Sequence, residues 1–349
     1  MILSSFVNVM KTKYLVILAV VAAVAVCAIE VLSRSVRPES KFRLYNAVSR
    51  LSEVDGFMWH YGLIDGEAVI VKAVPLNLLV RFEKVALPTI IEGYPVHMVV
   101  GDVFGANISV GTLVIPDGIT DIGSFAFWNN KIERVELSST VTNIDSNAFR
   151  SYTYKEYVVD PDNPMYCSNN GLLCSKDGRV LIRGTDGAMK IPDSIEQISN
   201  GAFCYRKVLN VPFPRNIKNI GSGAFLGCEG LEHVVVPSGV KSIAEFTFEM
   251  CRDLEYVEIP STVTNIGAYA FEGCDRLKKV VIHEGAIKIE KYAFANCKSL
   301  ESLIIPSSVE SIGEFAFSAC GSGLKMDINT EGIHVDPTAF SVTNNLVRQ

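Results

Sequence analysis

One stretch of the chain shows the unit from which most of it is built: residues 254–274 read LEYVEIPSTVTNIGAYAFEGC. The alternation Val257-x-Ile259 is typical of a short strand with one buried face. Pro260 ends this strand because proline has no N–H for a ladder hydrogen bond. The step at Gly267 predicts a second turn, and the Ala-Phe pair after it predicts a tight helical or 3₁₀ corner. So short a unit cannot bury its apolar side alone and needs neighbours.

The same unit recurs with a period of 22 or 23 residues. One phenylalanine per unit marks the register: Phe104, Phe127, Phe149, Phe203, Phe225, Phe248, Phe271, Phe294, Phe317 and Phe340. One interval, from Phe149 to Phe203, is longer and has 54 residues. Most of these residues follow Ala, most have Pro eleven residues before them, and nearly all have Ile or Val five residues before them. Because several registers repeat together, we predict stacked coils that share a continuous core.

The pattern Leu-x-x-Val-x-Ile-Pro-x-x-Val-x-x-Ile-Gly-x-x-Ala-Phe-x-x-Cys resembles the 23-residue leucine-rich repeats of the BspA-like surface protein family. The resemblance covers about Phe57 to Phe340. It implies a leucine-rich-repeat solenoid with a parallel β-sheet on the concave face and short 3₁₀ or helical turns on the convex side. It also implies a cell-surface or secreted protein whose relatives bind host or neighbouring-cell proteins.

We expect five segments along the 349 residues. They are a signal peptide or signal-anchor helix (1–33), a linker with a short helix (34–55), an N-terminal cap with the first coil (56–103), the leucine-rich-repeat solenoid (104–340) and a C-terminal tail (341–349). A β-hairpin insert at about 160–190, similar to one found in the family, accounts for the long interval between repeats. Its turn is expected near Asp177-Gly178.

The first segment holds the most hydrophobic run of the chain. Lys11 and Lys13 precede an uncharged stretch from Tyr14 to Ile29. A short basic region before such a run is typical of a signal peptide, and small residues favour cleavage after Ala28. An uncleaved span of nearly 20 residues is long enough to cross a bilayer as a transmembrane helix. Both alternatives place the body of the protein at the cell surface or outside; the third is a membrane tail with a cytoplasmic body.

Composition and motifs narrow the function. Hydrophobic residues make up 48% of the chain, too many for a disordered protein, and a net charge of −6 argues against a nucleic-acid partner. The five histidines share no motif with each other or with a nucleophile, and we find no nucleotide-binding, zinc-protease or serine-hydrolase signature. The sequence therefore predicts no enzyme, no cofactor and no metal site.

Five cysteines stand three residues after a repeat Phe: Cys228, Cys251, Cys274, Cys297 and Cys320. A fixed register is compatible with a metal array or a set of disulfides. However, no His or carboxylate recurs beside them to complete a zinc site, and parallel Cβ directions suit a disulfide poorly. We favour a buried ladder of thiols that pack as small apolar groups. Cys167 and Cys174 lie in the insert and could pair in an oxidising compartment.

The sheet face holds the candidate binding residues. Side chains alternate along a strand, so the residues that flank each core Val point outward. The candidates are His233, Tyr256 and Lys279 in one column and Val235, Glu258, Val281 and Ile304 in the neighbouring column. The first column continues through Thr112, Arg134, Asn210, Ser302 and Lys325, and the second through Val114, Glu136, Pro212 and Asp327. A mixed surface with an aromatic anchor suits protein recognition. The alternative explanation is strand propensity alone.

The sequence thus predicts a non-enzymatic cell-surface module for protein binding or adhesion. Its expected partners are proteins on host or neighbouring cells, and the N-terminal helix is expected to tether it to the membrane. The alternative is a structural envelope or scaffold protein without a specific ligand.

Overall fold

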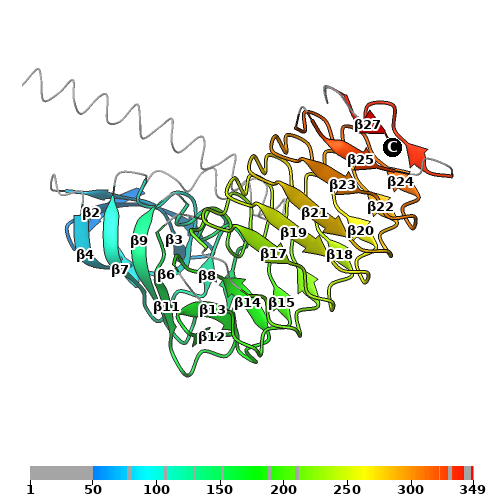
Figure 1. Ribbon diagram of the computed structural model, residues 1–349. Helices are drawn as coiled ribbons and strands as arrows, with labels where there is room; N and C mark the ends of the chain where they lie inside the picture. The colour runs from blue at the N-terminus through cyan, green and yellow to red at the C-terminus, as the bar shows by residue number, and fades with distance from the viewer. Residues whose placement is uncertain are drawn as a thin grey trace, which may run out of the picture.

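The computed structural model describes residues 50–76, 81–105, 108–128, 130–150, 153–187, 190–208, 212–321, 323–328, 332–341 and 347–348. Within these ranges the chain forms stacked coils of strands and turns, and none of it is helical (Figure 1). No helix of the described residues could therefore cross a membrane. The signal or anchor segment expected at residues 1–33 lies outside the described residues.

Each coil contributes one longer strand to a parallel sheet. In the C-terminal half this sheet consists of β17 (His233–Val235), β19 (Tyr256–Ile259), β21 (Lys279–Ile282), β23 (Ser302–Ile304), β25 (Lys325–Asp327) and β27 (Val347–Arg348) (Figure 1). Val257 lies beside Val280, one repeat further on. Residues of equal repeat position therefore stack on one another, as a solenoid requires.

In the N-terminal half, the long strands form a separate sheet. It consists of β4 (Arg81–Ala86), β7 (Ser109–Ile115), β9 (Lys131–Leu137) and β11 (Glu156–Val159). Adjacent strands are again parallel, with Leu113 beside Val135 and Val135 beside Tyr157. The repeat is thus the same in both halves, although the sheet is not continuous between them.

A second ladder of hydrogen bonds joins the two-residue strands, each of which ends at the Ile or Val five residues before the repeat Phe. They are β18 (Ser242–Ile243), β20 (Asn265–Ile266), β22 (Lys288–Ile289), β24 (Ser311–Ile312) and β26 (His334–Val335). The earlier members are β8 (Asp121–Ile122), β10 (Asn143–Ile144), β15 (Gln197–Ile198) and β16 (Asn219–Ile220). After these strands the N–H groups donate backward along the solenoid, as in the bond from Gly267 N to Ile243 O at 2.9 Å.

The Ala-Phe corner forms the third ladder, and the expected 3₁₀ or helical turns are not found there. Alternate N–H groups close β-turns within the coil, such as Ala270 N to Gly267 O. The intervening groups donate forward to the next coil, such as Phe271 N to Ala293 O at 2.8 Å. Tyr269 has a φ of 59°, which is incompatible with a right-handed helix. The corner is therefore a run of β-turns fixed by the neighbouring coil.

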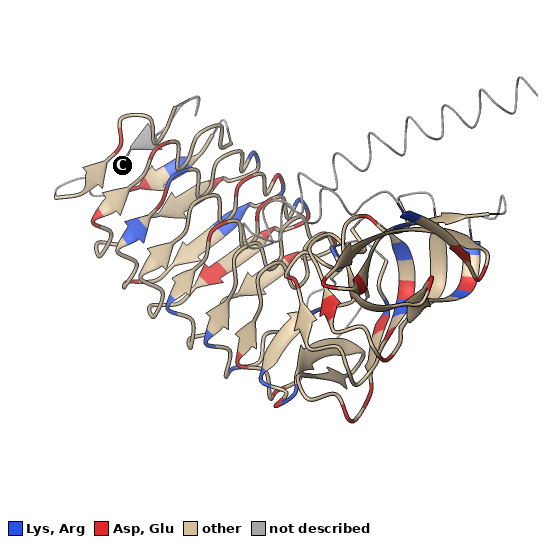
Figure 2. Ribbon diagram, turned by 180° about the vertical axis from the view of Figure 1, so that it is seen from behind, with Lys and Arg blue, Asp and Glu red and all other residues tan. Residues whose placement is uncertain are grey.

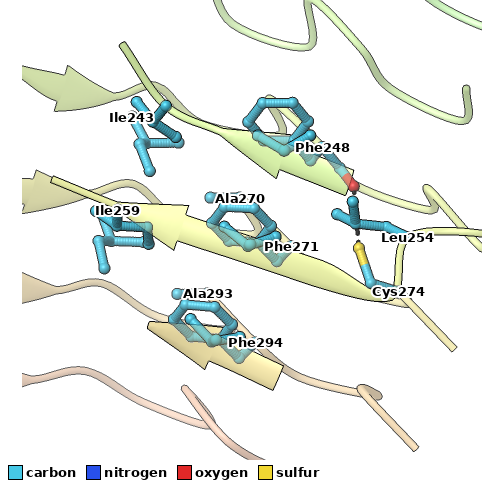
Figure 3. Packing of buried hydrophobic residues seen from close by; sticks show 14 of the residues in the cluster. Ile243, Phe248, Leu254, Ile259, Ala270, Phe271, Cys274, Ala293 and Phe294 are labelled. Carbon is cyan, nitrogen blue, oxygen red and sulfur yellow. Dashed lines mark hydrogen bonds between the residues drawn. The ribbon is translucent and has the colours of Figure 1, made fainter. Parts of the chain in front are cut away.

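The repeat phenylalanines form the centre of the core (Figure 3). Phe271 stacks between Phe248 and Phe294 with ring centroids 5.3 and 5.1 Å away and interplanar angles of 9° and 5°. Offset stacking of this kind adds about 0.5–1.5 kcal/mol per pair to the burial of the rings. Ile243, Leu254 and other aliphatic side chains of the same columns surround the stack.

Antiparallel strands cover the first coil. β1 (Arg50–Val54), β2 (Phe57–Ile64) and β3 (Glu67–Pro75) form a meander, and β3 then pairs in parallel with β6 (Tyr94–Val99). β6 also forms an antiparallel hairpin with β5 (Ile90–Ile91) and pairs in parallel with β8. Residues 50–54 are thus a strand, although we expected them in a linker of helical character. The meander buries Trp59 and Tyr61 against the first coil. It closes an edge that would otherwise be open to pairing.

The insert contributes three strands: β12 (Tyr166–Asn169), β13 (Leu172–Ser175) and β14 (Val180–Arg183). They pair in antiparallel fashion, and β14 then pairs in parallel with β15. The buried amide of Asn163 anchors the insert, since its Nδ2 donates to Ser138 O and Val141 O while its Oδ1 accepts from Met165 N and Tyr166 N, all at 2.8–2.9 Å.

Two buried arginines lie where the insert interrupts the Phe stack. Arg183 donates to the carbonyl oxygens of Ser146 and Asn200. Arg206 donates to Phe149 O at 3.1 Å and lies over the Tyr154 ring at 4.7 Å. Burial lowers the pKa of Arg183, and the like charge of Arg206 adds to the effect. Arginine and tyrosine side chains thus bridge the two halves of the core.

Candidate functional site

The seven candidate residues lie on one face of the long-strand sheet. His233, Tyr256 and Lys279 are neighbours on β17, β19 and β21. Val235, Glu258 and Val281 are neighbours on the same three strands, and Ile304 follows on β23. We refer to these seven residues as the sheet-face patch.

The pleat explains why the patch faces outward. In each strand the central residue is buried, as Val234, Val257 and Val280 are, while its two flanking residues are half-buried or exposed. Val235 and Ile304 expose 57% and 66% of their surface. Because side chains alternate along a strand, burial of the central Val places the patch on the surface.

Polar contacts hold the middle of the patch in place. The Tyr256 hydroxyl donates to Glu258 Oε2 at 3.1 Å, and His283 Nε2 lies 3.0 Å from Glu258 Oε1. The contact with His283, followed by that with Tyr256, holds the pKa of the Glu258 carboxyl below its ordinary value. Desolvation, with the same hydrogen bond to Glu258, raises the pKa of Tyr256.

His283 belongs to this group, and we did not predict it as a site residue. It stands where most repeats carry Pro, and its ring is about half exposed. The replacement of a strand-ending Pro by a titratable side chain is a sequence signal that identifies it. Lys279 completes the surroundings of Tyr256, with Nζ 6.0 Å from the ring centroid, while the His233 ring lies 6.3 Å away on the other side.

The two columns differ in character. The first column carries aromatic and basic groups and ends at Lys325, whereas the second carries aliphatic and acidic groups and ends at Asp327. Ionic and apolar groups thus alternate over short distances on the patch.

The earlier members of both columns form a different surface. Arg134 bonds to Glu136 at 3.1 Å and also to Glu156, while Lys84 reaches Glu136 at 3.2 Å. Figure 2 shows charged residues of both signs side by side on these strands, whereas charged positions are scattered in the C-terminal half. These charges pair with one another, whereas the exposed aliphatic residues Val235 and Ile304 lie in the C-terminal half. Asn210 lies outside the described residues.

The cysteine ladder has the structural role that we predicted. Each thiol is buried and donates to the carbonyl oxygen of a Phe in the preceding coil: Cys228 to Phe203, Cys251 to Phe225, Cys274 to Phe248, Cys297 to Phe271 and Cys320 to Phe294, at 3.0–3.3 Å. Burial raises the pKa of the Cys320 thiol to about 12, which keeps it protonated at neutral pH. Figure 3 shows the bond that Cys274 donates.

The two cysteines of the insert face each other across β12 and β13. Both thiols are free, and Cys167 donates to Ser175 O at 3.1 Å. Burial raises the pKa of the Cys174 thiol to about 12. Among the described residues, no three His, Cys, Asp or Glu side chains come together as metal ligands would.

Comparisons with known proteins agree with this geometry. The BspA type leucine-rich repeat region matches in six copies over residues 82–171, 187–287 and 264–348. A search of curated proteins gave no match.

Two solved structures share the fold. A leucine-rich repeat protein from Eubacterium ventriosum is 18% identical, with a TM-score of 0.51 over 76% of this chain and 93% of that chain. The pneumococcal vaccine antigen PcpA is 16% identical, with a TM-score of 0.53 over 87% of this chain and 99% of that chain. At these identities the likeness concerns the fold. The repeat match extends over most of the chain, and the protein therefore belongs to the BspA-type leucine-rich repeat family.

Proposed function

We propose that this protein is a non-enzymatic surface module that binds a protein ligand through the sheet-face patch. The observation that supports it most directly is that the half-buried Tyr256 lies on the same sheet face as the exposed aliphatic side chains of Val235 and Ile304. Aromatic anchors amid apolar contacts and a polar rim are typical of protein interfaces. Repeat proteins generally use such extended faces for binding.

The proposed location is the cell surface, with partners on host or neighbouring cells. Membership of the BspA-type family supports this location, as does the description of one structural relative as a vaccine antigen. Tethering through the N-terminal segment, and the concave shape of the patch face, stay predictions from the sequence.

Binding to surface proteins tests the proposal. The purified chain would be used to capture proteins from surface-labelled cells, and the affinity of the captured protein would then be measured for Tyr256→Ala, His233→Ala and Ile304→Ser. We expect at least one substitution to weaken binding about tenfold or more, which corresponds to about 1.4 kcal/mol.

Matched substitutions away from the patch serve as controls. Ile287→Ser changes another exposed isoleucine, on the short-strand side, and His334→Ala replaces a histidine of β26. Neither control should weaken binding. Unchanged affinity in all three patch variants would exclude the patch as the binding surface.

The alternative function is a structural envelope or scaffold protein without a specific ligand. Strand propensity alone would explain Val, Ile and Tyr on this face. This alternative predicts an abundant surface protein and no saturable partner in the capture experiment.

A further inference from the structure

A second aromatic column lies on the turn side of the solenoid, away from the sheet-face patch. Phe246, Tyr269, Tyr292 and Phe315 each stand two residues before a repeat Phe. Their ring centroids are 5.1, 4.9 and 5.0 Å apart along the column. All four residues are half-buried, so the edges of the rings reach the surface.

The backbone of this column is unfavourable for aromatic residues. The four residues have φ between 53° and 60°. A left-handed conformation costs an ordinary residue roughly 1–2 kcal/mol. The forward hydrogen bonds of the turns impose this conformation, and stacking of neighbouring rings offsets part of its cost.

Two glycines continue the column toward the N-terminus. Gly223 and Gly201 occupy the same repeat position in the two preceding coils, with φ of 59° and 60°. Their N–H groups make the same forward bonds, to Glu245 O and Ser222 O at 3.0 Å. The backbone of the column therefore continues for two coils where the rings stop. A Cβ at either glycine would meet only side-chain atoms at 3.7 Å or more.

A groove occupies the place of the two missing rings. It has a volume of about 350 Å³, within the range of ligand pockets, which is on the order of 300–1,000 Å³. Its lining includes both glycines, Leu226 and Phe246, the first ring of the column. We call it the ring slot.

Two charged side chains, Arg150 and Glu249, line the ring slot. Arg150 lines the slot with its guanidinium 5.1 Å above the Tyr205 ring, and its buried Nε has no hydrogen-bond partner among the described residues. Glu249 lines the same slot. Burial and the nearby Glu272 raise the pKa of Glu249, and the positive charge of Arg150 opposes this rise.

We propose that the ring slot binds an aromatic side chain of a protein ligand that carries an acidic residue next to it. The ring extends the column by stacking on Phe246 above Gly223, and the carboxylate accepts hydrogen bonds from Arg150. Arginine recognises a carboxylate by such charge-assisted bonds. Asn147 and Asn200 at the rim offer amide groups to the backbone of the same peptide.

The test uses the full chain and a dye-labelled peptide, acetyl-Gly-Trp-Asp-Gly, with binding followed by fluorescence anisotropy. Gly223→Phe fills the slot with a ring at a φ that the neighbouring coils already accept in Phe and Tyr. We expect it to weaken binding about tenfold or more. Asn296→Phe adds a ring at a φ of 60° outside the slot and should leave binding unchanged.

A second pair of measurements isolates the charge. Arg150→Gln should weaken binding of the Asp peptide about tenfold but not binding of the same peptide with Asn, while Arg252→Gln, at an exposed arginine elsewhere, should change neither. Phe246→Leu gives the aromatic test if Gly223→Phe does not fold.

Several outcomes would overturn the proposal. The first is that the Trp-Asp peptide shows no saturable binding to the parent chain. The second is that a Leu-Asp peptide binds the parent chain as tightly as the Trp-Asp peptide does. The third is that the Gly223→Phe and Phe246→Leu variants bind the Trp-Asp peptide with the affinity of the parent chain. Tighter binding of free indole-3-acetate than of the peptide would reject a protein ligand in favour of a small aromatic acid. These results do not depend on the sheet-face patch.

Discussion

The Cys274 thiol illustrates how one atom connects two coils. It is fully buried and donates to Phe248 O at 3.2 Å, and burial raises its pKa well above the ordinary value. The same register position in five coils thus supplies a small apolar group together with a weak donor for a carbonyl oxygen that faces the core.

Cys274→Ala removes this donor and leaves a small cavity. We expect a loss of about 1–2 kcal/mol in the free energy of unfolding, because a small cavity forms and the Phe248 carbonyl keeps only the backbone bond from Cys251 N. Urea unfolding would measure it. In the parent chain, the five ladder thiols should react with a thiol reagent at pH 8 only after denaturation; fast reaction of the native protein would contradict their burial.

The Glu258 carboxyl gives a prediction for pH. Its folded-state pKa lies below 4.5, chiefly because of His283, so its stabilising contacts are complete above that pH and are lost as the pH falls through the folded-state pKa. Titration of the Glu258 carboxyl carbon by NMR should give a midpoint below 4.5, and His283→Ala should move it upward. An unchanged midpoint would contradict the contact between these two side chains.

At the scale of one element, Gly184 shows how the insert rejoins the stack. A Cβ at this residue would lie 2.0 Å from the Phe203 ring, so its backbone packs directly on the first ring of the C-terminal half. Its N–H donates to Ala202 O at 2.9 Å, so the backbone has little room to move away.

Gly184→Ala should therefore destabilise the protein by about 1–3 kcal/mol through overpacking. Gly323→Ala is the control, because a Cβ there meets no atom within 4 Å. Thermal unfolding of both variants would show the difference. Equal melting temperatures would mean that the Phe203 ring can shift without cost.

The sequence predicted the long strand and the cysteine ladder of each coil, but not the conformation of the turns. Val257-x-Ile259 predicted a strand because burial on one face imposes a period of two, and the Cys register predicted a thiol ladder because identical positions stack. The Ala-Phe corner was wrongly expected to be helical because the bonds that decide it come from the next coil. His283 and the glycines of the ring slot carry readable signals, but their meaning depends on which columns reach the surface.

At the scale of the whole molecule, Arg206 and Arg183 join two hydrophobic cores that the insert separates. Both arginines are almost fully buried, and Nε and Nη1 of Arg206 lack a hydrogen-bond partner among the described residues. Desolvating a guanidinium costs several kcal/mol. No sequence pattern predicts this pair, because only the stacked coils bring residues 183 and 206 together.

We expect Arg206→Met to be as stable as the parent chain or more stable, since it removes a buried charge while retaining volume. Arg206→Ala should lose about 2–4 kcal/mol because it leaves a cavity. Urea unfolding of the two variants separates charge from packing. Equal losses in both would show that the hydrogen bond to Phe149 and the Tyr154 contact outweigh desolvation.

The hydrogen bonds of the Ala-Phe ladder and of the two-residue-strand ladder run in opposite directions, and this gives each coil a fixed orientation. Between coils, backbone N–H groups of the Phe turns donate toward the C-terminus, while those after the two-residue strands donate back toward the N-terminus. In a coil inserted in the reverse orientation, N–H groups would therefore face N–H groups of one neighbouring coil, and carbonyl groups would face carbonyl groups of the other. Duplication of a whole 23-residue unit satisfies both sides at once, so such a protein can gain or lose length by complete coils during evolution. The insert before Gly184 departs from the repeat, and its strands pair with one another in antiparallel fashion instead.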